Sequence, residues 1–530
     1  MVQIAQFPTR ILQTHLINFG HKHKDMGDPT MTLPQRSIPP VKSTKYLGVI
    51  IDRNLNWKAQ QAYTVEKGTK WTAQIRWLTC PTWGLTPKCA KQLYISVALP
   101  RILYAADVWC TPTSCEHPRP KALGSAKVSK QLATIQRAGA LPITGGLRSS
   151  PTDALDASTF LLPAPSTISK WCLRAYTRLA MLLKEHPLYK TVNWKVTSTT
   201  KRHRGLIHNL ARTYNVATKA VEKIPTAARN PSMMGKLPFR ISIPVDKEAS
   251  VLEAANSNEE IQVYSDGSAH GGKVGAAAIL SRGNNPDHIL HFYLGRETEH
   301  MVHEAELVGL LLALHLIHME KRSGTTCSIA VDNQAMLKAF NSDLRKPGHH
   351  LAREALHLAN QMQKRKGKHK YKLTLRWSAG HVGIAGNEKA DLEAKKVASK
   401  HSSQVSLLPP YLRKPLFSNL SALRRDHSDK LKKDWSAKWS QSKRGKTAKR
   451  MDNSSPSVKF LKTISNPKLS RKAASQIAQL RMQHYPLNGY LHKIKRVDKV
   501  NCPACGADVE SIMHFLLTCQ SYAHERWALA

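Results

Sequence analysis

Acidic residues are scarce in this sequence. Asp and Glu together number 36 among 530 residues, against 80 Lys and Arg, so the formal net charge is +44 at pH 7. An enzyme that acts on small molecules rarely needs such an excess, whereas a protein that binds a polyanion gains from it. The basic residues also run along the whole chain rather than in one tail. Nucleic acid is therefore the first expected partner and an acidic membrane surface the second.

The low number of cysteines and the lack of a long apolar run narrow the class of protein further. Nine cysteines, an odd number, do not make a disulfide scaffold. The N-terminal residues contain neither a long apolar core nor a cleavage-like site, so we expect no signal peptide. The longest apolar stretch, ELVGLLLALHLIHM, is broken by His315 and His318 and is shorter than the ~20 residues of a membrane span. We expect a soluble intracellular protein, nuclear or cytoplasmic, with no membrane partner and no small-molecule substrate. Six cysteines are expected to be ordinary thiols: Cys80, Cys89, Cys110, Cys115, Cys172 and Cys327.

Four carboxylates stand in four separate motifs. They are Asp266 in YSDGSAHGG, Glu306 in HEAEL, Asp332 in AVDNQA and Asp391 in GNEKAD. Asp266 and Asp332 are expected at strand ends, and the two others on helices. If the fold gathers them, their oxygens suit hard divalent cations, and Mg²⁺ or Mn²⁺ would fit equally. Two such ions about 4 Å apart can activate water and stabilise a leaving oxygen.

Two alternatives remain at this point. The acids could be separate surface residues, as most single Asp residues are. Glu304 could also take the ligand role in place of Glu306, although the apolar helix face that follows favours Glu306.

The pattern of residues 261–400 predicts an α/β fold. Three strand-like runs are followed by a long helix, a fourth strand, two helices, a fifth strand, a glycine-punctuated loop (AGHVGIAG) and a last helix. This order implies a mixed five-stranded sheet with flanking helices.

The same motifs resemble those of type 1 ribonuclease H. YSDGSAHGG, HEAELVGLLLAL, AVDNQAML and WSAGHVGIAGNEKAD follow one another in that family's order. The resemblance implies endonucleolytic cleavage of the RNA strand of an RNA–DNA hybrid by two metal ions. It also implies that Asp266, Glu306, Asp332 and Asp391 bind the metal. His381 matches the histidine that assists catalysis, through proton transfer or product release.

The N-terminal region resembles another part of a retroelement protein. KYLGVIIDRNLNW, LYISVALPRILYAADVW and LATIQRAGALPITGG are similar to the thumb and connection of non-LTR retrotransposon (LINE-like) reverse transcriptases. The paired aspartates of a polymerase should precede this region, and no two Asp residues are adjacent in the sequence. We therefore expect no polymerase active site. The alternative is a basic helical bundle of the same fold.

A Cys/His cluster lies near the C-terminus. Its four members, spaced C-x2-C-x8-H-x4-C, are Cys502, Cys505, His514 and Cys519. Two cysteines on a tight turn with a His and a Cys beyond it suit tetrahedral zinc, and free thiols are the alternative. The cluster resembles the zinc knuckle of many non-LTR retrotransposon proteins. With eleven residues after Cys519, that module could be truncated.

These signals predict five segments along the chain. They are a helical thumb and connection remnant (1–195), a basic linker (196–258), a ribonuclease H domain (259–400), a basic linker with helices (401–495) and a zinc-knuckle-like segment (496–530). The main functional prediction is a hybrid-cleaving ribonuclease from a retrotransposon. The alternatives are a non-catalytic nucleic-acid-binding protein from a decayed element and a reading frame whose product never folds.

Overall fold

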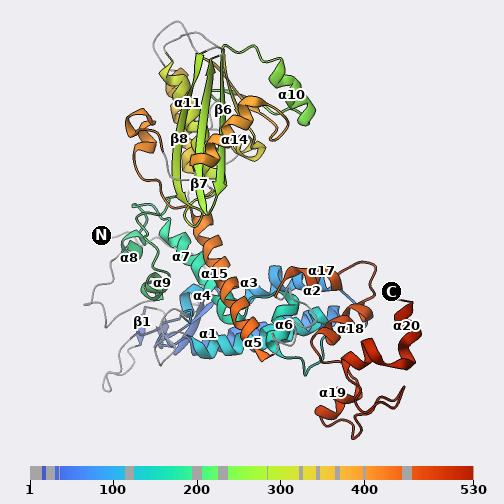
Figure 1. Cartoon of the computed structure of the whole chain (residues 1–530). Coiled ribbons are helices and arrows are strands. Elements are labelled where there is room, and N and C mark those ends of the chain that lie inside the picture. The colour runs from blue at the N-terminus through green and yellow to red at the C-terminus, as the bar shows by residue number, and fades with distance from the viewer. Residues whose placement is uncertain are drawn as a thin grey trace. The chain divides into compact units, whose positions relative to one another are not determined.

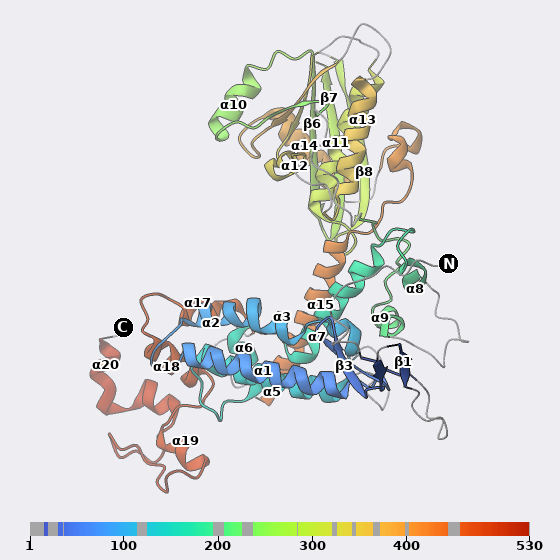
Figure 2. The ribbon, with the colours of Figure 1, turned by 180° about the vertical axis from the view of Figure 1, so that it is seen from behind.

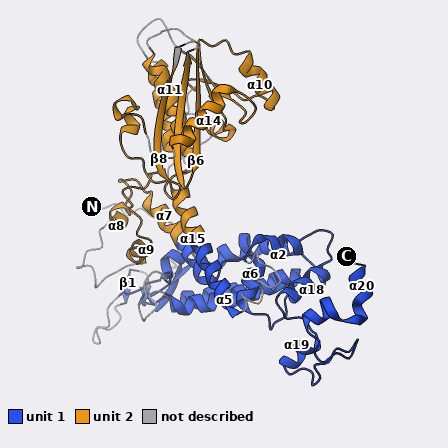
Figure 3. Cartoon of the chain, viewed as in Figure 1, with its two compact units in different colours: residues 1–172, 430–530 blue, residues 173–429 orange. Residues whose placement is uncertain are grey.

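The chain forms two compact units, residues 1–172 with 430–530 and residues 173–429 (Figure 3). The computed structural model describes residues 15–19, 30–34, 36–113, 125–193, 206–224, 237–282, 285–320, 326–341, 346–363, 371–397, 402–443 and 456–528. Each unit is described by itself.

The second unit is built around a six-stranded mixed sheet (Figure 1). Its strands are β5 (Arg240–Ser242), β6 (Ile261–His270), β7 (Lys273–Arg282), β8 (Asn285–Arg296), β9 (Thr326–Val331) and β10 (Lys372–Trp377). The order is β5-β10-β9-β6-β7-β8. The pairs β6–β7 and β7–β8 are antiparallel, whereas β6–β9, β9–β10 and β10–β5 are parallel.

Helices cover both faces of this sheet. Helices α11 (Val302–Met319) and α13 (His349–Gln363) lie on one face, and α14 (Ala385–Val397) lies on the other (Figures 1 and 2). The central strands are therefore buried on both sides, which explains why three consecutive alanines of β7, residues 276–278, are fully buried. A short helix, α12 (Gln334–Ala339), follows β9.

Helix α11 is the central core helix of this unit. By length and composition it is the one helix among the described residues that could cross a membrane, yet 78% of its apolar stretch is buried inside the protein. A helix that is apolar on nearly all sides is also the form that a buried core helix takes.

The sheet has one strand more than the five predicted. The extra strand, β5, pairs with Thr374–Arg376 at the free edge of β10. It lies in the segment 196–258 that we predicted to be a linker, and the described part of that segment also contains α9 (Leu206–Tyr214) and α10 (Lys247–Ala255). Three residues between two prolines are too short to show strand periodicity, so only the pairing with β10 reveals this strand.

The first unit is mostly helical, as predicted for the N-terminal part. Its helices are α1 (Lys58–Leu78), α2 (Pro87–Leu93), α3 (Leu99–Ile102), α4 (Ala106–Trp109), α5 (Ala126–Thr144), α6 (Thr152–Thr159), α17 (Val458–Ile464), α18 (Arg471–Arg481), α19 (Asn488–Lys493) and α20 (Ala523–Trp527). Two small hairpins precede them, β1 (Met31–Leu33) with β2 (Arg36–Ile38), and β3 (Ser43–Tyr46) with β4 (Val49–Asp52). Helices α7 (Ala164–Ala180) and α15 (Leu420–Gln441) each cross from one unit into the other, and α8 (Tyr189–Asn193) belongs to the second unit.

Two C-terminal helices pack on the N-terminal ones. Helix α17 contacts α2 and α6, and α18 contacts α5. The Arg471 guanidinium donates to the carbonyls of Cys80 at 3.0 Å and Ile143 at 3.1 Å, and the Gln479 amide donates to the Gly145 carbonyl at 2.7 Å. The segment 401–495, predicted to be a linker with helices, thus contributes part of this unit's core. Its partners lie more than three hundred residues away, so no local pattern in the sequence reveals the packing.

Candidate metal-binding active site

Strand register places two of the four predicted carboxylates side by side. The parallel pairing of β6 with β9 ends at Ser265 and Val331. Asp266 and Asp332 are the next residues on their chains, and side chains at equivalent positions of parallel strands point to the same face. We predicted both at strand ends. Asp332 does follow β9, but β6 continues through Asp266 to His270, where it still pairs with β7.

Close packing of helix against sheet brings in the third carboxylate. A Cβ atom at Gly267 would lie 2.2 Å from the backbone nitrogen of Glu306, a distance that no real side chain tolerates. Glycine at this position therefore lets the first turns of α11 rest directly on the backbone of β6. The side chain of Glu306 then lies beside Asp266.

The three carboxylates form one compact group. Asp266, Glu306 and Asp332 each offer an oxygen atom within 4.8 Å of the others. Asp266 and Glu306 are each 5% exposed, and Asp332 is half-buried. The buried oxygen Oε2 of Glu306 has no hydrogen-bond partner among the described residues. A buried carboxylate oxygen without a partner is costly unless a cation neutralises it.

The pKa values of the three carboxylates also favour a bound cation. Burial, together with the charges of Asp332 and Asp391, raises the pKa of Asp266 to about 7. Burial and the nearby charge of Asp266 raise the pKa of Glu306 well above its ordinary value. Burial also raises the pKa of Asp332. Without a cation the cluster therefore resists full ionisation, and a divalent ion would remove this penalty.

Asp391 lies at the side of this group. It sits in α14, on the opposite face from α11. Its charge raises the pKa of both Asp266 and Asp332, but its oxygens are not among the atoms that lie within 4.8 Å of one another. Asp391 Oδ2 instead pairs with Lys395 Nζ at 2.7 Å. We did not predict this cation, although the i,i+4 spacing on a helix is the signal that could have revealed it.

His381 lies on the loop beside Asp332. The loop spans residues 378–384, between β10 and α14, and His381 is exposed there with a positive φ of 58°. Its charge lowers the pKa of Asp332 against the larger effect of burial, which places the two side chains within electrostatic reach. A Cβ atom at Gly380 would lie 3.3 Å from Asp332 Oδ2, so the start of the loop touches the carboxylate group.

Two neighbouring side chains have structural roles. Glu304, the competing ligand, turns away from the cluster, because its Oε2 accepts from the backbone N–H of Met301 at 2.9 Å and so caps α11. Asn333 donates from its side chain to Glu306, and its Oδ1 accepts from the N–H of Met336 at 3.0 Å and caps α12.

The C-terminal Cys/His residues also come together in space. Ligand atoms of Cys502, Cys505, His514 and Cys519 lie within 4.8 Å of one another. Cys502 Sγ lies 3.9 Å from Cys519 Sγ, and Cys505 Sγ lies 3.2 Å from His514 Nε2. Burial raises the pKa of the Cys502 thiol, but hydrogen bonds from backbone N–H groups and with His514 outweigh this effect and lower the pKa to about 7. Three sulfurs and one imidazole nitrogen form a donor set that suits zinc.

None of the eight cysteines that the structure describes is in a disulfide. Cys115 lies outside the described residues.

Comparison with known proteins identifies the class of the second unit's central domain. The RNase H family model matches residues 258–399. Together with the mixed sheet and its flanking helices, this match shows that the chain carries an RNase H domain.

A curated retrotransposon protein is similar to part of this chain. A stretch of 128 residues is 24% identical to the putative 115 kDa protein in type-1 retrotransposable element R1DM of Drosophila melanogaster. The match covers 22% of this chain and 12% of that protein. The chain therefore spans about an eighth of the length of this relative.

Solved structures of ribonucleases H are similar to part of this chain. RNase H1 from the halophilic archaeon Halobacterium salinarum is 17% identical, and the match covers 27% of this chain and 98% of that one with a TM-score of 0.21. LC11-RNase H1 in complex with an RNA/DNA hybrid is 16% identical, and the match covers 26% of this chain and 97% of that one with a TM-score of 0.22.

Proposed function

We propose that residues 258–399 hydrolyse the RNA strand of RNA–DNA hybrids as a type 1, endonucleolytic ribonuclease H. The observation that carries this proposal is the buried cluster of Asp266, Glu306 and Asp332, with an unpartnered oxygen on Glu306. The family match of the domain supports the same reaction. A retrotransposon relative supports a role on nucleic acid, since reverse transcription produces such hybrids.

The residues fit a pair of divalent cations. Asp266, Glu306 and Asp332 offer only oxygen atoms, and Asp391 adds a fourth carboxylate at the side of the cluster. Hard ions such as Mg²⁺ or Mn²⁺ prefer such ligands and retain part of their water shell. Bound there, the ions would supply an activated water and stabilise the charge on the phosphate oxygens.

The protein's own groups carry out the remaining steps. The carboxylates hold their positions because β6, β9 and α11 are packed core elements. The oxygen of a water molecule bonds to the scissile phosphorus and the water releases a proton to solvent, while the bond from phosphorus to the 3′ oxygen breaks. We assign to His381 the delivery of a proton to that 3′ oxygen, because its exposed imidazole lies within electrostatic reach of Asp332. The products are a 3′-hydroxyl and a 5′-phosphate.

Binding of the hybrid would depend on the basic character of the chain. The excess of 80 Lys and Arg over 36 Asp and Glu suits a polyphosphate partner. Specificity for a hybrid requires contacts to the 2′-hydroxyl groups of the RNA strand.

We further propose that residues 1–530 form no polymerase active site, because the sequence contains no adjacent aspartates.

We propose zinc at the C-terminal cluster of Cys502, Cys505, His514 and Cys519. The convergence of three thiols and an imidazole supports this assignment. Zinc there would hold together a segment whose helices are as short as the five residues of α20.

The test of the main proposal is cleavage of a labelled hybrid. The full chain should cut the RNA strand with Mg²⁺, and a chelator should abolish the cut. Asp332→Asn should lose cleavage and keep hybrid binding, because the change removes one charge from the cluster but leaves the protein surface intact. Glu304→Gln is the matched control and should keep cleavage, since Glu304 is buried like Glu306 but caps α11 instead of joining the carboxylate cluster. Hybrid binding without cleavage by the wild type would support the non-catalytic alternative.

A further inference from the structure

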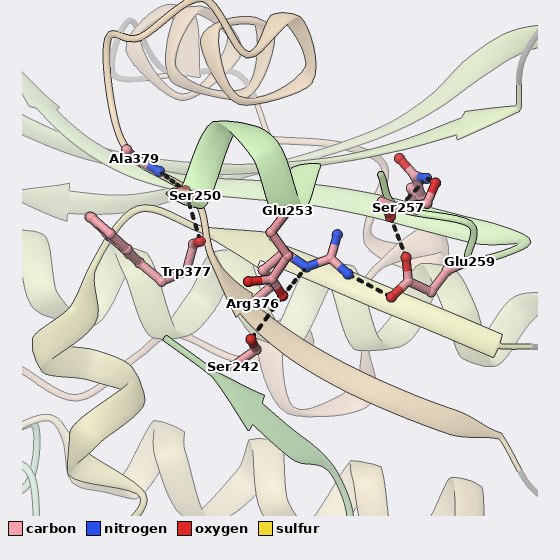
Figure 4. Close-up of polar contacts among 9 residues, drawn as sticks. Ser242, Ser250, Glu253, Ser257, Glu259, Arg376, Trp377 and Ala379 are labelled. Atoms are coloured by element: carbon pink, nitrogen blue, oxygen red, sulfur yellow. Dashed lines mark hydrogen bonds and ion pairs between the residues drawn. The ribbon is translucent and has the colours of Figure 1, made fainter. Parts of the chain in front are cut away.

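Helix α10 lies outside the RNase H family segment but contacts the end of β10 and the start of the His381 loop. It spans Lys247–Ala255 and precedes residue 258, where the family match begins. Together with β5 it forms an arm that leads into the domain, and both elements lie against β10 (Figure 4). We call residues 240–257 the arm.

Ser250 is the point where the arm meets the start of the His381 loop. The residue is fully buried. Its hydroxyl donates to the Trp377 carbonyl at 3.2 Å and accepts from the Ala379 N–H at 2.9 Å (Figure 4). One side chain of the arm thus bonds the backbone on both sides of Ser378, at the point where β10 ends and the loop begins.

A buried arginine holds the arm in this place. Arg376 Nε pairs with Glu253 Oε1 at 3.0 Å, and Arg376 Nη2 pairs with Glu259 Oε1 at 2.6 Å (Figure 4). Ser242 Oγ of β5 donates to the same Glu253 carboxylate at 2.8 Å. Arg376 is 8% exposed, and its charge is thus matched by two carboxylates from the segment that includes the arm. The arm is a fixed part of this unit.

The backbone that Ser250 holds is in contact with the carboxylate cluster. The indole N–H of Trp377 donates to the Asp332 carbonyl at 2.9 Å. The backbone N–H of Ser378 donates to the Val331 carbonyl at 2.8 Å. Gly380 follows, where an added Cβ atom would lie 3.3 Å from Asp332 Oδ2, and His381 comes next. A shift of Ala379 would therefore be transmitted to both Asp332 and His381.

We propose that Ser250 is a positioning residue of the active site. It fixes the start of the 378–384 loop and so sets His381 against Asp332, although it lies outside the family domain and does not belong to the metal cluster. The inference rests on the proposed hybrid cleavage. It assigns to the arm a role in catalysis in addition to its packing on the sheet edge.

The test compares full-chain variants in the hybrid-cleavage assay. Ser250→Ala removes both hydrogen bonds and leaves the Ala379 N–H buried without a partner, so we expect kcat to fall about tenfold. The KM for the hybrid should stay unchanged, because Ser250 is buried and does not reach a substrate. Ser242→Ala is the matched control, since it removes a hydroxyl from the same arm without touching the loop, and its kcat should equal that of the wild type.

A double-mutant cycle separates positioning from general stability. If Ser250 acts through His381, Ser250→Ala should have almost no further effect on a His381→Ala background. If Ser250 only stabilises the domain, the two losses should multiply. Hydrogen exchange adds a readout that does not depend on activity, because the Ala379 amide should exchange faster in Ser250→Ala than in Ser242→Ala.

Each outcome has a distinct meaning. Equal kcat values for Ser250→Ala and the wild type, or multiplying losses in the cycle, would overturn the positioning role. An inactive wild type would instead remove the proposed function. If Ser250→Ala does not fold, Ser250→Cys keeps the volume but forms weaker hydrogen bonds, and the same cycle applies to it.

Discussion

Replacing Asp266 by Asn should stabilise the metal-free protein while abolishing cleavage. The pKa of Asp266 rises from an ordinary 3.8 to about 7 in the fold, chiefly through burial. Because the folded state holds this proton more tightly than the unfolded chain, the free energy of unfolding falls as the pH rises from about 4 to about 7. Asn does not ionise in this pH range, so Asp266→Asn avoids this loss in the free energy of unfolding.

The magnitude follows from the shift. The difference between 3.8 and about 7 corresponds to about 4 kcal/mol at pH 8, where both states are ionised. At pH 5 the folded carboxyl stays protonated while most of the unfolded chain is ionised, and the penalty shrinks to about 2 kcal/mol. In chelator, Asp266→Asn should therefore exceed the wild type in stability by more at pH 8 than at pH 5.

The assay is urea unfolding of the full chain in chelator. Unfolding of this domain is followed by hydrogen exchange of peptides from β6 and α11, which separates it from the first unit. Adding Mg²⁺ should stabilise the wild type and leave Asp266→Asn nearly unchanged. A variant no more stable than the wild type at pH 8, or a gain that is the same at both pH values, would refute the electrostatic reasoning.

Three further predictions concern other parts of the chain. Gly267→Ala should greatly destabilise the domain and remove cleavage, because its Cβ would meet the Glu306 nitrogen at 2.2 Å, whereas Gly271→Asn, where nothing lies within 4 Å, should melt like the wild type. Cys502→Ser should lose bound zinc by atomic absorption yet keep hybrid cleavage, and lost cleavage would tie the cluster to the active site. Asp156→Asn should raise the stability of the first unit at pH 8 by up to about 4 kcal/mol in urea unfolding, because burial raises the pKa of Asp156 to about 7, and an unchanged stability there would contradict it.

Local sequence signals predicted much of the fold. The sequence predicts a helix over residues 58–78, where the structure has α1. It also predicts a helix over residues 129–146 that ends at Gly145 and Gly146, and α5 does end there, with Gly145 in a left-handed conformation. Strand and helix order in residues 261–400 also matched, because long periodic segments carry their own signal.

The elements that the sequence did not predict depend on contacts with distant parts of the chain. Strand β5 exists because β10 offers a free edge, and α17 and α18 are core helices because distant helices cover their apolar faces. Residues 87–109 predict a helix that is interrupted at Pro100 and then resumes. In the structure a π-helical turn, Tyr94–Ala98, directly precedes α3, which carries Pro100 in its first turn, and a second break falls at residues 103–105.

The candidate site also contains residues that the sequence predicted and contacts that it did not. The motifs pointed to Asp266, Glu306 and Asp332, and the structure brings these three together. The choice of Glu306 over Glu304 agrees with the cap that Glu304 provides. The ion pair of Asp391 with Lys395 could have been predicted from its i,i+4 spacing on one helix. The contact of Ser250 with the loop depends on the placement of residues that lie far apart in the sequence, which residue patterns alone do not supply.

The central claim is that distant acids converge to hold divalent ions, and anomalous diffraction tests it most directly. A crystal of the protein soaked in Mn²⁺ should show an anomalous peak bounded by carboxylate oxygens of Asp266, Glu306 and Asp332, and the peak should vanish in Asp332→Asn. A well-ordered site with no Mn²⁺ between these three side chains would contradict the account.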